Sequence, residues 1–573
     1  MELEQLLKEV DHKSYPAYKS LKGRYPFPSY VLSIDHVQGD PFAAPSSVSL
    51  HISREKHGFP KDSYEEYHRR VRLSDFLLRS FAKAIARYDK QAGGSGKSGV
   101  ISVSRPKQEI LERSALTIDP KTGMLIVRLL VGFPAAGRTT LAMELKKILM
   151  DYLPRAAKES LYYSAVQKTE LEKWLSLADD QKAVRDRLSD LGLVAFVANG
   201  SILPRRSGVD DRPMEKAVSF SSPKELELTI DLPGGRSIKG MGIKKGITLI
   251  VGGGYHGKST LLKALERGVY DHIPGDGREM VITEPTAMKL RAEDGRSIKE
   301  TDISPFIKNL PNGKDTTNFS TEDASGSTSQ AACTLEALMA GSNTLLIDED
   351  TSATNFMVRD DLMQRVVLRD KEPITPFLYR MRQLFDEKAI STVLVAGSSG
   401  AFFSESDCII QMDEYRPLDI TEETKKLIKA ENIERVKAPG ELPELEDKRI
   451  PLPGKALNDN NKRVKVKSQG TNALSLGHES IEIRFVEQLV DQEQTNLLGV
   501  LLRYMEEELF DGKKTLPECV DILWELLSEK GMAAIVNKGE LPGNLAMVRR
   551  QELLAMINRY RGLNLKKGHK GNI

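Results

Sequence analysis

The chain has 573 residues, of which 40% are hydrophobic and 29% charged, a balance ordinary for a soluble globular protein of several domains. Its 83 basic and 81 acidic residues leave a net charge of only +2, so any basic surface for a nucleic acid must be local. Three widely spaced cysteines argue against a disulfide framework or a zinc site. The N-terminus has no signal-peptide pattern and no run of 18 apolar residues occurs, so we expect a cytoplasmic protein without a membrane segment.

The first 160 residues predict a mixed α/β domain. Pro26–Asp40 has the pattern of a strand followed by a loop, and residues 65–90 have helical spacing. Further strands are expected at Val100–Val103 and Met124–Val131, and a helix at about 139–152. We expect residues 1–160 to form one N-terminal domain.

Residues 161–445 have the pattern of an α/β core with an antiparallel β-subdomain before it. A charged stretch with helical spacing covers residues 160–190. Antiparallel strands are indicated by an apolar run and two alternating segments, Leu193–Ala198, Val218–Leu232 and Ser237–Ile243. Short, continuously apolar strands, typical of buried parallel sheets, are expected at Thr248–Val251, Thr344–Ile347 and Thr392–Val395.

Residues 446–573 predict a mostly helical C-terminal domain. The stretch 421–475 is rich in Lys, Glu, Pro and Asn, which indicates a helix leaving the core and then a linker. Residues 481–563 are mostly helical in pattern, and the last residues, KKGHKGNI, predict a disordered basic tail.

The most specific motif lies between a predicted strand and a predicted helix. Residues 252–259 read GGGYHGKS and fit the P-loop pattern G-x-x-x-x-G-K-[ST] in full. Glycines let the backbone bend so that several N–H groups point at phosphates, and the next helix directs its positive end there. We predict an ATP site whose phosphate contacts are Gly252, Gly253, Gly254, Gly257, Lys258, Ser259 and Thr260. Lys258 would reach the β- and γ-phosphates as a catalytic residue, and Ser259 would bind Mg²⁺.

A strand that ends in acidic residues follows downstream. The strand Thr344–Ile347 runs into Asp348, Glu349 and Asp350, which is the pattern of a Walker B segment. Asp348 would hold the Mg²⁺ ion, and Glu349 would be the catalytic base that polarises the attacking water. A strand end with an acidic turn explains these residues equally well in isolation, but the P-loop upstream favours catalysis.

A serine-rich loop selects among P-loop proteins. Ala324–Gln330, ASGSTSQ, precedes the helix-like stretch Ala331–Met339 and ends 18 residues before Asp348. It resembles the signature loop of ABC proteins, written L-S-G-G-Q in transporters. Ser325, Gly326 and Ser327 are therefore predicted to bind a γ-phosphate through a hydroxyl and helix N-terminal amides. In ABC proteins this phosphate belongs to the other subunit, so the resemblance implies a head-to-tail homodimer; the alternative is a serine-rich helix cap.

Two expected ABC features are altered. Ser352–Asn355 stands at the place of the D-loop, but no histidine occurs between His272 and His478, so the switch histidine that follows the strand Thr392–Val395 is missing. Ser398 or Ser399 could contact the γ-phosphate there, although a serine does not carry a proton in the same way. No glutamine Q-loop is evident, and Arg291–Arg296 is expected in its place.

The whole pattern resembles the predicted ATPases of the ABC class found in bacteria and some eukaryotes, over nearly the whole chain. The resemblance rests on the segments Ile34–Ser46, Val197–Gly208, Gly252–Leu262, Arg291–Ile298, Asp323–Gln330 and Leu345–Met357. It implies an extra N-terminal domain, a central ABC ATPase that uses ATP and Mg²⁺, and a helical C-terminal domain. A kinetoplastid mitochondrial relative is associated with RNA editing and binds RNA, so RNA or single-stranded nucleic acid is an implied partner class.

Weaker signals are kept as hypotheses. Gly132–Thr139 resembles a P-loop with Arg138 for Lys, and a structural turn, a phosphate contact and a second nucleotide site stay open. Asp35 and His36 are more consistent with a structural pair than with acid–base chemistry. Local positive charge that would suit a nucleic acid comes from Arg205, Arg206, Arg549, Arg550, Arg559, Arg561, Lys566 and Lys567, with Tyr560 as an aromatic partner.

Two functions follow from these motifs. The first is a soluble ABC-class ATPase that slowly hydrolyses Mg-ATP at a homodimer interface, coupled to RNA binding. The second is an ATP-gated conformational switch with weak turnover that acts on a protein partner. A transporter energy subunit is disfavoured, because the large N- and C-terminal domains have no place in a minimal subunit of that kind.

Overall fold

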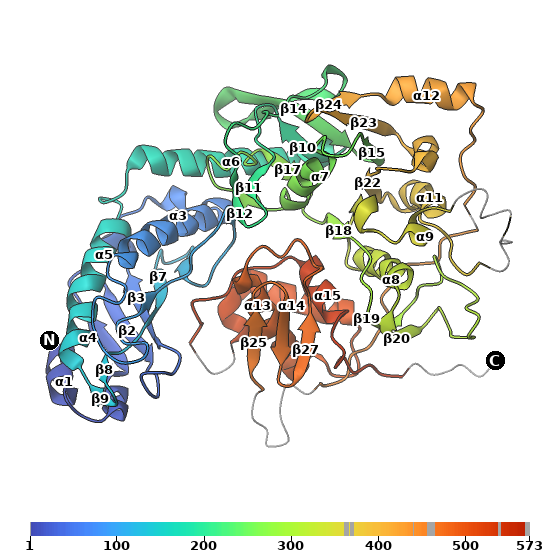
Figure 1. Cartoon of the computed structure of the whole chain (residues 1–573). Helices are drawn as coiled ribbons and strands as arrows, with labels where there is room; N and C mark the ends of the chain where they lie inside the picture. The colour runs from blue at the N-terminus through green and yellow to red at the C-terminus, as the bar shows by residue number, and fades with distance from the viewer. Residues whose placement is uncertain are drawn as a thin grey trace. The chain divides into compact units, whose positions relative to one another are not determined.

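A computed structural model describes residues 2–359, 366, 372–438, 440–454, 464–536 and 540–567. The chain divides into two compact units (Figure 1). The first unit comprises Met1–Lys182 and Met532–Met547, and the second comprises Ala183–Gly531 and Val548–Ile573. No helix among the described residues is long and apolar enough to cross a lipid bilayer.

The first unit is built on an antiparallel sheet with strand order β1-β2-β3-β7-β4, and β6 also pairs with β7. These strands are β1 (Gly23–Pro26), β2 (Val31–His36), β3 (Ser46–Ile52), β4 (Ile101–Ser102), β6 (Leu116–Ile118) and β7 (Leu125–Val131). Alternation along β3 places Val48, Leu50 and Ile52 in one core with Leu77 and Phe81 of helix α3 (Tyr67–Ala86). The helix therefore covers the apolar face of the sheet.

Shorter elements complete the first unit. Its other helices are α1 (Glu2–Val10), α2 (Arg54–His57), α4 (Ala142–Lys147) and α5 (Leu153–Ser160), while α6 (Lys168–Asp190) leads into the second unit. The remaining strands are β5 (Glu109–Ile110), β8 (Ala135–Ala136) and β9 (Thr139–Thr140). The last two pair as a hairpin, which places a tight turn at Gly137.

The second unit contains the predicted P-loop core, a sheet of order β18-β21-β22-β15-β23-β24. Its first five strands are parallel and β24 is antiparallel. They are β15 (Ile247–Val251), β18 (Met288–Leu290), β21 (Thr344–Asp348), β22 (Ser391–Val395), β23 (Cys408–Asp413) and β24 (Arg416–Asp419). All side chains of β21 and β22 are buried, because helices cover a parallel sheet on both faces.

Helices and a second sheet surround this core. The helices are α7 (Lys258–Arg267), α8 (Gly326–Met339), α9 (Thr354–Met357), α11 (Leu378–Lys388) and α12 (Thr421–Ala430). The predicted antiparallel β-subdomain has the order β13-β14-β10-β17, formed by β10 (Leu193–Ala198), β13 (Glu227–Leu232), β14 (Arg236–Lys244) and β17 (Val281–Thr283). The remaining strands of this part lie outside both sheets and are β11 (Arg205–Ser207), β12 (Asp210–Pro213), β16 (Asp271–His272), β19 (Arg296–Thr301) and β20 (Phe319–Ala324).

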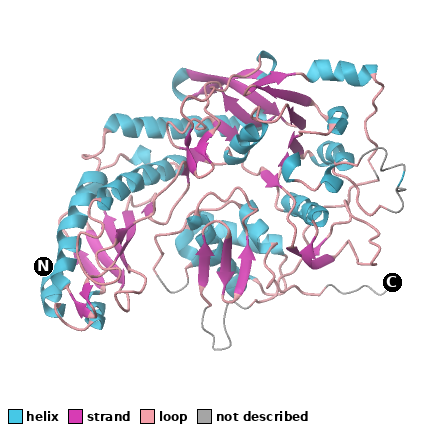
Figure 2. Cartoon of the chain, in the orientation of Figure 1, coloured by secondary structure: helices cyan, strands magenta, loops and turns pink. Residues whose placement is uncertain are grey.

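The C-terminal part combines helices with a small sheet (Figure 2). Helices α13 (Gln492–Tyr504), α14 (Leu516–Lys530) and α15 (Arg550–Ile557) confirm the helical pattern. The meander β25 (Val466–Gln469), β26 (Ala473–Leu476) and β27 (Glu479–Glu482) is a correction, because β25 and β26 fall in the stretch predicted as a linker. Only Leu474, Leu476 and Ile481 anchor it in the core, which left too few apolar positions for the sequence to indicate strands.

Other differences are local. Residues 218–226, expected to continue an antiparallel strand, contain no strand, and α15 is shorter than the helix expected over Ala546–Leu563. Helix α8 begins at Gly326, inside the serine-rich loop, and not at Ala331. Residues 568–573 of the predicted basic tail lie outside the described residues.

Candidate functional site

The loop between β15 and α7 has P-loop geometry. Gly252 and Gly257 have φ angles of 137° and 98°, and a Cβ at Gly252 would lie 2.3 Å from the carbonyl oxygen of Met412, so a side chain does not fit there. Lys258 Nζ donates to the carbonyl oxygens of Gly252 (2.7 Å) and Gly253 (2.9 Å). The lysine therefore curls over the loop, and the unpaired amides at the start of α7 face the same space.

Three residues with left-handed backbone angles gather beside this loop. Tyr255 (φ 63°), Glu414 (φ 44°) and Tyr415 (φ 69°) are not glycines, and such angles cost about 1–2 kcal/mol each. His256 joins the two segments: its Nδ1 accepts from the Glu414 N–H (2.9 Å), and its carbonyl oxygen accepts from the Tyr415 N–H (3.2 Å). The Tyr255 side chain is 98% exposed. Strain of this kind is typical of ligand sites.

A cleft of about 700 Å³ opens over the P-loop. Its lining includes Tyr255, Lys258, Ser259 and Thr260 of the P-loop segment, together with a mainly apolar group formed by Leu203, Pro204, Val218, Phe220 and Met412. A loop that offers amides and a lysine, joined to an apolar wall, matches the two halves of a nucleotide: charged phosphates and a flat base. The volume lies within the range of small-molecule sites.

The predicted acidic residues lie at the same edge of the parallel sheet. Strands β21, β22 and β15 are neighbours and parallel, so Asp348, Val395 and the P-loop all follow their carboxyl ends. Asp348 is 8% exposed, and within the described part of the chain its side chain accepts from the Asp350 N–H alone, at 3.3 Å, a long contact that leaves oxygen lone pairs for another ligand.

Glu349 is held by the loop that follows β22. Its carboxylate accepts from the N–H of Gly397 (2.6 Å), the N–H of Ser398 (3.1 Å) and the Ser398 hydroxyl (2.8 Å). Burial alone would raise the pKa of Glu349, but these hydrogen bonds outweigh it and hold the pKa below its ordinary value of 4.5. The candidate base is thus ionised and bound to the loop where the switch histidine was expected.

The serines of that loop already have partners. Ser398 Oγ binds Glu349, and Ser399 Oγ accepts from the Ala401 N–H at 3.3 Å as the cap of a 3₁₀ turn, Gly400–Glu405. The γ-phosphate contact expected of one of them would require these bonds to open.

The donor set suits a magnesium–nucleotide complex. The Ser259 hydroxyl and the Asp348 carboxylate are the oxygen ligands that Mg²⁺ prefers. Within the described ranges, no group of three or more His, Cys, Asp and Glu side chains is arranged as a metal site. The metal would therefore take further oxygen ligands from the phosphates and water, as Mg²⁺ does in phosphate-transfer sites.

The signature-like loop lies elsewhere. Ser325 caps α8, and its hydroxyl is 3.0 Å from that of Thr328. Gln330 ties α8 to the D-loop position, since its Nε2 donates to Ser352 Oγ (3.0 Å) and its Oε1 accepts from the Ala353 N–H (2.7 Å). The residues that line the nucleotide cleft do not include Ser325, Gly326 or Ser327, so this loop lies outside the cleft of its own chain.

The P-loop-like segment Gly132–Thr139 is a structural turn. Its amides are already bonded: those of Phe133, Ala135 and Gly137 donate to Gln38 Oε1, Ser98 Oγ and Ser95 Oγ at 2.9–3.1 Å. No row of free donors is left for a phosphate. Asp35 likewise accepts from the Ser33 and Ser49 hydroxyls, which supports the structural interpretation of that residue.

Much of the predicted C-terminal basic surface is internal, which corrects the sequence-based hypothesis. Arg559 and Tyr560 are 8% and 1% exposed, so this tyrosine cannot stack on a nucleobase. Acidic partners hold most of the arginines, in the pairs Arg205–Asp276, Arg206–Glu215, Arg549–Glu552, Arg550–Asp521, Arg559–Glu293 and Arg561–Glu322. An apolar helix stripe is visible in a sequence, whereas the carboxylate that neutralises each arginine is not.

Three protein-family models match consecutive parts of the chain. A P-loop domain model of ABC ATPases matches residues 167–448, a model described as ATPase of the ABC class N-terminal matches 1–164, and a model of the MRB1590 C-terminal domain matches 465–566. The chain belongs to the ABC-class ATPases. The three matches follow one another along nearly the whole chain, and the fold is the predicted ABC-type P-loop core with N- and C-terminal additions.

Individual relatives are more distant. An uncharacterized protein of Methanocaldococcus jannaschii, MJ1628, is 36% identical over 214 residues, which are 34% of this ATPase chain and 47% of that protein. The chain thus spans about half the length of this curated relative. Among solved structures, cbiO1 of Clostridium perfringens is 13% identical with a TM-score of 0.27, over 42% of this chain and 95% of its own. The ATP-binding cassette MJ1267 in its ADP conformation is 13% identical with a TM-score of 0.25, over 42% and 96%.

Proposed function

We propose that this ABC-class ATPase binds Mg-ATP in the cleft over Gly252–Thr260 and hydrolyses it slowly. The observation that carries the proposal is the shared sheet edge, where Lys258 curls over the P-loop after β15 and Asp348 and Glu349 stand at the carboxyl end of β21, with β22 between the two strands. Lys258 would neutralise charge on the β- and γ-phosphates, and Ser259 and Asp348 would hold Mg²⁺. When bound, the metal neutralises charge that develops on the phosphates.

Glu349 would orient the attacking water and accept its proton. In the nucleotide-free chain the Gly397–Ser398 loop binds this carboxylate, so the base must be released before it can act. Ser398 occupies the region of the missing switch histidine and does not shuttle a proton at neutral pH. The bound state of Glu349 and the lack of a switch histidine both lead us to expect slow turnover. The contact of the Gly397–Ser398 loop with Glu349, called the latch below, also favours the second candidate function, an ATP-gated switch with weak turnover that acts on a protein partner.

Two copies are proposed to share the ATP. Ser325 is exposed and lies outside the cleft of its own chain, so a second chain is needed to bring this hydroxyl to a γ-phosphate. Light scattering of Glu349→Gln with and without ATP tests this: we expect a dimer with ATP and a monomer without it. A monomer in both states contradicts the head-to-tail arrangement.

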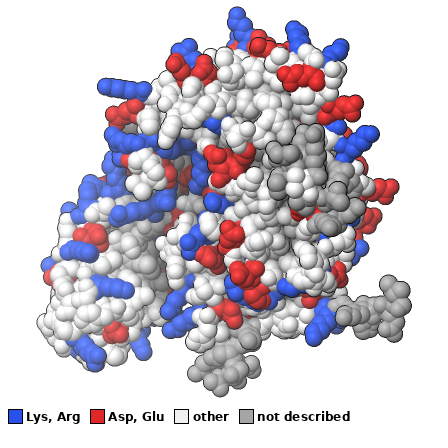
Figure 3. All heavy atoms as spheres, turned by 45° about the vertical axis from the view of Figure 1, so that its right-hand side comes forward, with Lys and Arg blue, Asp and Glu red and all other residues white. Residues whose placement is uncertain are grey.

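RNA coupling is proposed with a location different from the one the sequence favoured. Residues 1–182 carry 29 Lys and Arg against 22 Asp and Glu, and among the charged side chains on the visible face of the first unit Lys and Arg predominate (Figure 3). ATP turnover should be measured with RNA, single-stranded DNA and duplex DNA at two salt concentrations, with Glu349→Gln as the control. Stimulation that salt weakens and the variant lacks supports a nucleic-acid-coupled ATPase, since phosphate contacts release counterions. Absence of both stimulation and binding refutes it and favours a protein partner.

A further inference from the structure

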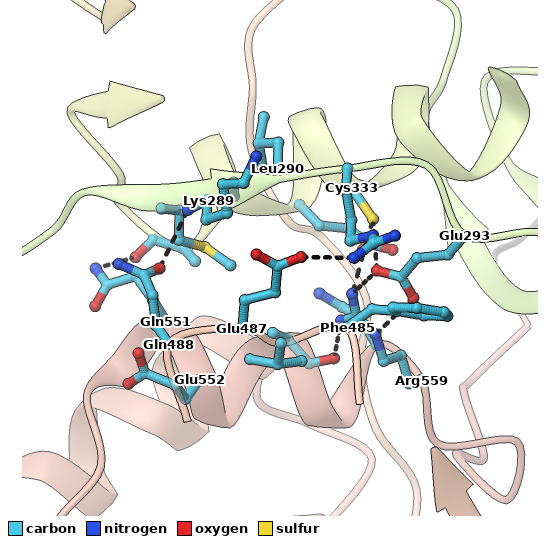
Figure 4. Close-up of a pocket in the computed structure, with 18 residues that line it drawn as sticks. Lys289, Leu290, Glu293, Cys333, Phe485, Glu487, Gln488, Gln551, Glu552 and Arg559 are labelled. Atoms are coloured by element: carbon cyan, nitrogen blue, oxygen red, sulfur yellow. Dashed lines mark hydrogen bonds and ion pairs between the residues drawn. The ribbon is translucent and has the colours of Figure 1, made fainter. Parts of the chain in front are cut away.

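A short C-terminal segment, Phe485–Gln488, packs against the edge strand β18 of the ATPase core (Figure 4). Strand β18 in turn pairs with the Walker B strand β21. Gln488 is 3% exposed and joins three backbone groups. Its Oε1 accepts from the Lys289 N–H (3.1 Å), and its Nε2 donates to the carbonyl oxygens of Glu266 (3.2 Å) and Ala287 (3.0 Å). One amide side chain thus ties the end of α7, which carries the P-loop, to the edge strand β18.

Glu487 adds charged contacts to the same two elements. Its carboxylate accepts from Arg291 at 2.6 Å and from Lys263 of α7 at 3.5 Å. The Arg291 guanidinium also lies over the Phe485 ring, 4.4 Å from the centroid. The segment is therefore held in place by the Gln488 amide, by the Glu487 ion pairs and by the Phe485 ring, whereas a simple linker would not require such specific contacts.

Lys289 connects this contact to the catalytic turn. It is 8% exposed, and its Nζ donates to Thr351 Oγ1 at 3.4 Å. Thr351 ends the 3₁₀ turn that begins at Glu349, and its hydroxyl donates to the carbonyl oxygen of Asp348 at 3.2 Å. Burial lowers the pKa of Lys289, and the charges of Glu487 and Asp348 oppose that shift. The buried ammonium thus lies in the field of the Glu487, Asp348 and Glu266 carboxylates.

We propose that Phe485–Gln488 is a strut that positions the catalytic turn, with Glu487 acting through Lys289 and Arg291. Glu487, Lys289 and Arg291 are positioning residues, because none of them lines the nucleotide cleft. The proposal rests on the proposed ATPase function and assigns the C-terminal segment a role in it. Because the P-loop keeps its own contacts, loss of the Glu487 charge should slow the chemical step and leave nucleotide binding unchanged. Coupling through packed and hydrogen-bonded elements of this kind is worth about 0.5–2 kcal/mol.

The test compares Glu487→Gln with Glu482→Gln in the full chain. Glu482 lies on β27 of the same C-terminal part and is exposed, and its ion pair within the described residues is with Arg484, so it is a matched control for loss of a carboxylate charge. We expect kcat to fall about 2- to 30-fold in Glu487→Gln, with KM for ATP within about twofold of the wild type. Lys289→Met should lose a similar factor, and the double variant should lose no more, since in this proposal Glu487 acts through its charge on the Lys289 ammonium.

A second readout does not depend on turnover. Amide hydrogen exchange over Glu349–Ala353 should be faster in Glu487→Gln than in Glu482→Gln without nucleotide. If Glu487→Gln does not fold, Arg291→Gln removes the same ion pair from the other side. Equal kcat and equal exchange in both glutamate variants would overturn the proposal while the ATPase function stands. Absence of ATP turnover in the wild type would overturn the proposed function and, with it, this inference.

Discussion

Replacement of Ser398 by alanine tests whether the switch-loop serine restrains the catalytic base. The change removes one of the three described hydrogen bonds to Glu349, the one from the Ser398 hydroxyl at 2.8 Å, and leaves the donors of Gly397 N and Ser398 N. If this bond is a latch, its loss should raise the rate of ATP hydrolysis. If Ser398 instead contacts the γ-phosphate, its loss should lower that rate.

The expected size follows from the geometry. A hydrogen bond to a charged group is worth about 1.5–3 kcal/mol when buried. Glu349 is half-buried and keeps two backbone donors, so we use about 0.5–1 kcal/mol, after discounting for solvent. At about 1.4 kcal/mol per tenfold, release of the base becomes about 2- to 5-fold easier, and kcat should rise by that factor if release limits the rate.

The pH dependence of kcat provides an independent test of the latch. The hydrogen bonds hold the pKa of Glu349 below 4.5, so removal of one donor should raise that pKa toward its ordinary value. The acid limb of kcat should accordingly move to higher pH in Ser398→Ala. A lower kcat with an unmoved acid limb would refute the latch, and Ser404→Ala, a half-buried serine of the following 3₁₀ turn that lies outside this contact, is the control.

Three further substitutions have defined outcomes. Lys258→Ala should weaken ATP binding about 10- to 100-fold by loss of charge-assisted bonds, measured with a fluorescent nucleotide, and unchanged affinity would contradict the P-loop assignment. Arg559→Met should cost about 3–5 kcal/mol in urea unfolding because the buried Glu293 loses its ion-pair partner, whereas exposed Arg561→Met should cost at most about 1 kcal/mol; equal costs would refute the buried pair. Tyr255→Gly should stabilise the nucleotide-free protein by up to about 1 kcal/mol in the same assay, because it relieves a left-handed angle, and a clear loss of stability would show that this exposed side chain has a structural contact.

Local patterns carried most of the prediction. The P-loop and the Walker B strand are contiguous in sequence, and their chemistry depends on glycines, a lysine and carboxylates at fixed spacing, so both were placed correctly in the parallel sheet. The antiparallel subdomain was predicted for a similar reason, because β13 and β14 alternate apolar and polar residues with period two.

Contacts between distant segments could not be predicted in this way. Glu349 and Ser398 are 49 residues apart, and the sequence gives no sign that a hydroxyl replaces the expected histidine as a partner of the carboxylate. The charge of Arg559 indicated a surface, but its partner Glu293 lies 266 residues away. Gln488 supplies an amide to an edge strand, a role that no residue pattern encodes.

Single-turnover hydrolysis of ATP by the wild type and by Glu349→Gln tests the central claim most directly. Enzyme in excess over ATP is mixed with ATP in the presence of Mg²⁺, and the reaction is quenched at successive times. Bound nucleotide is measured in parallel. The account predicts that both proteins bind ATP alike, that the wild type converts it to ADP, and that the variant is slower by about 10²- to 10⁴-fold, the usual contribution of a general base. Equal rates in the two proteins, or no conversion by the wild type, would contradict the assignment of this chain as an ATPase with Glu349 as its base.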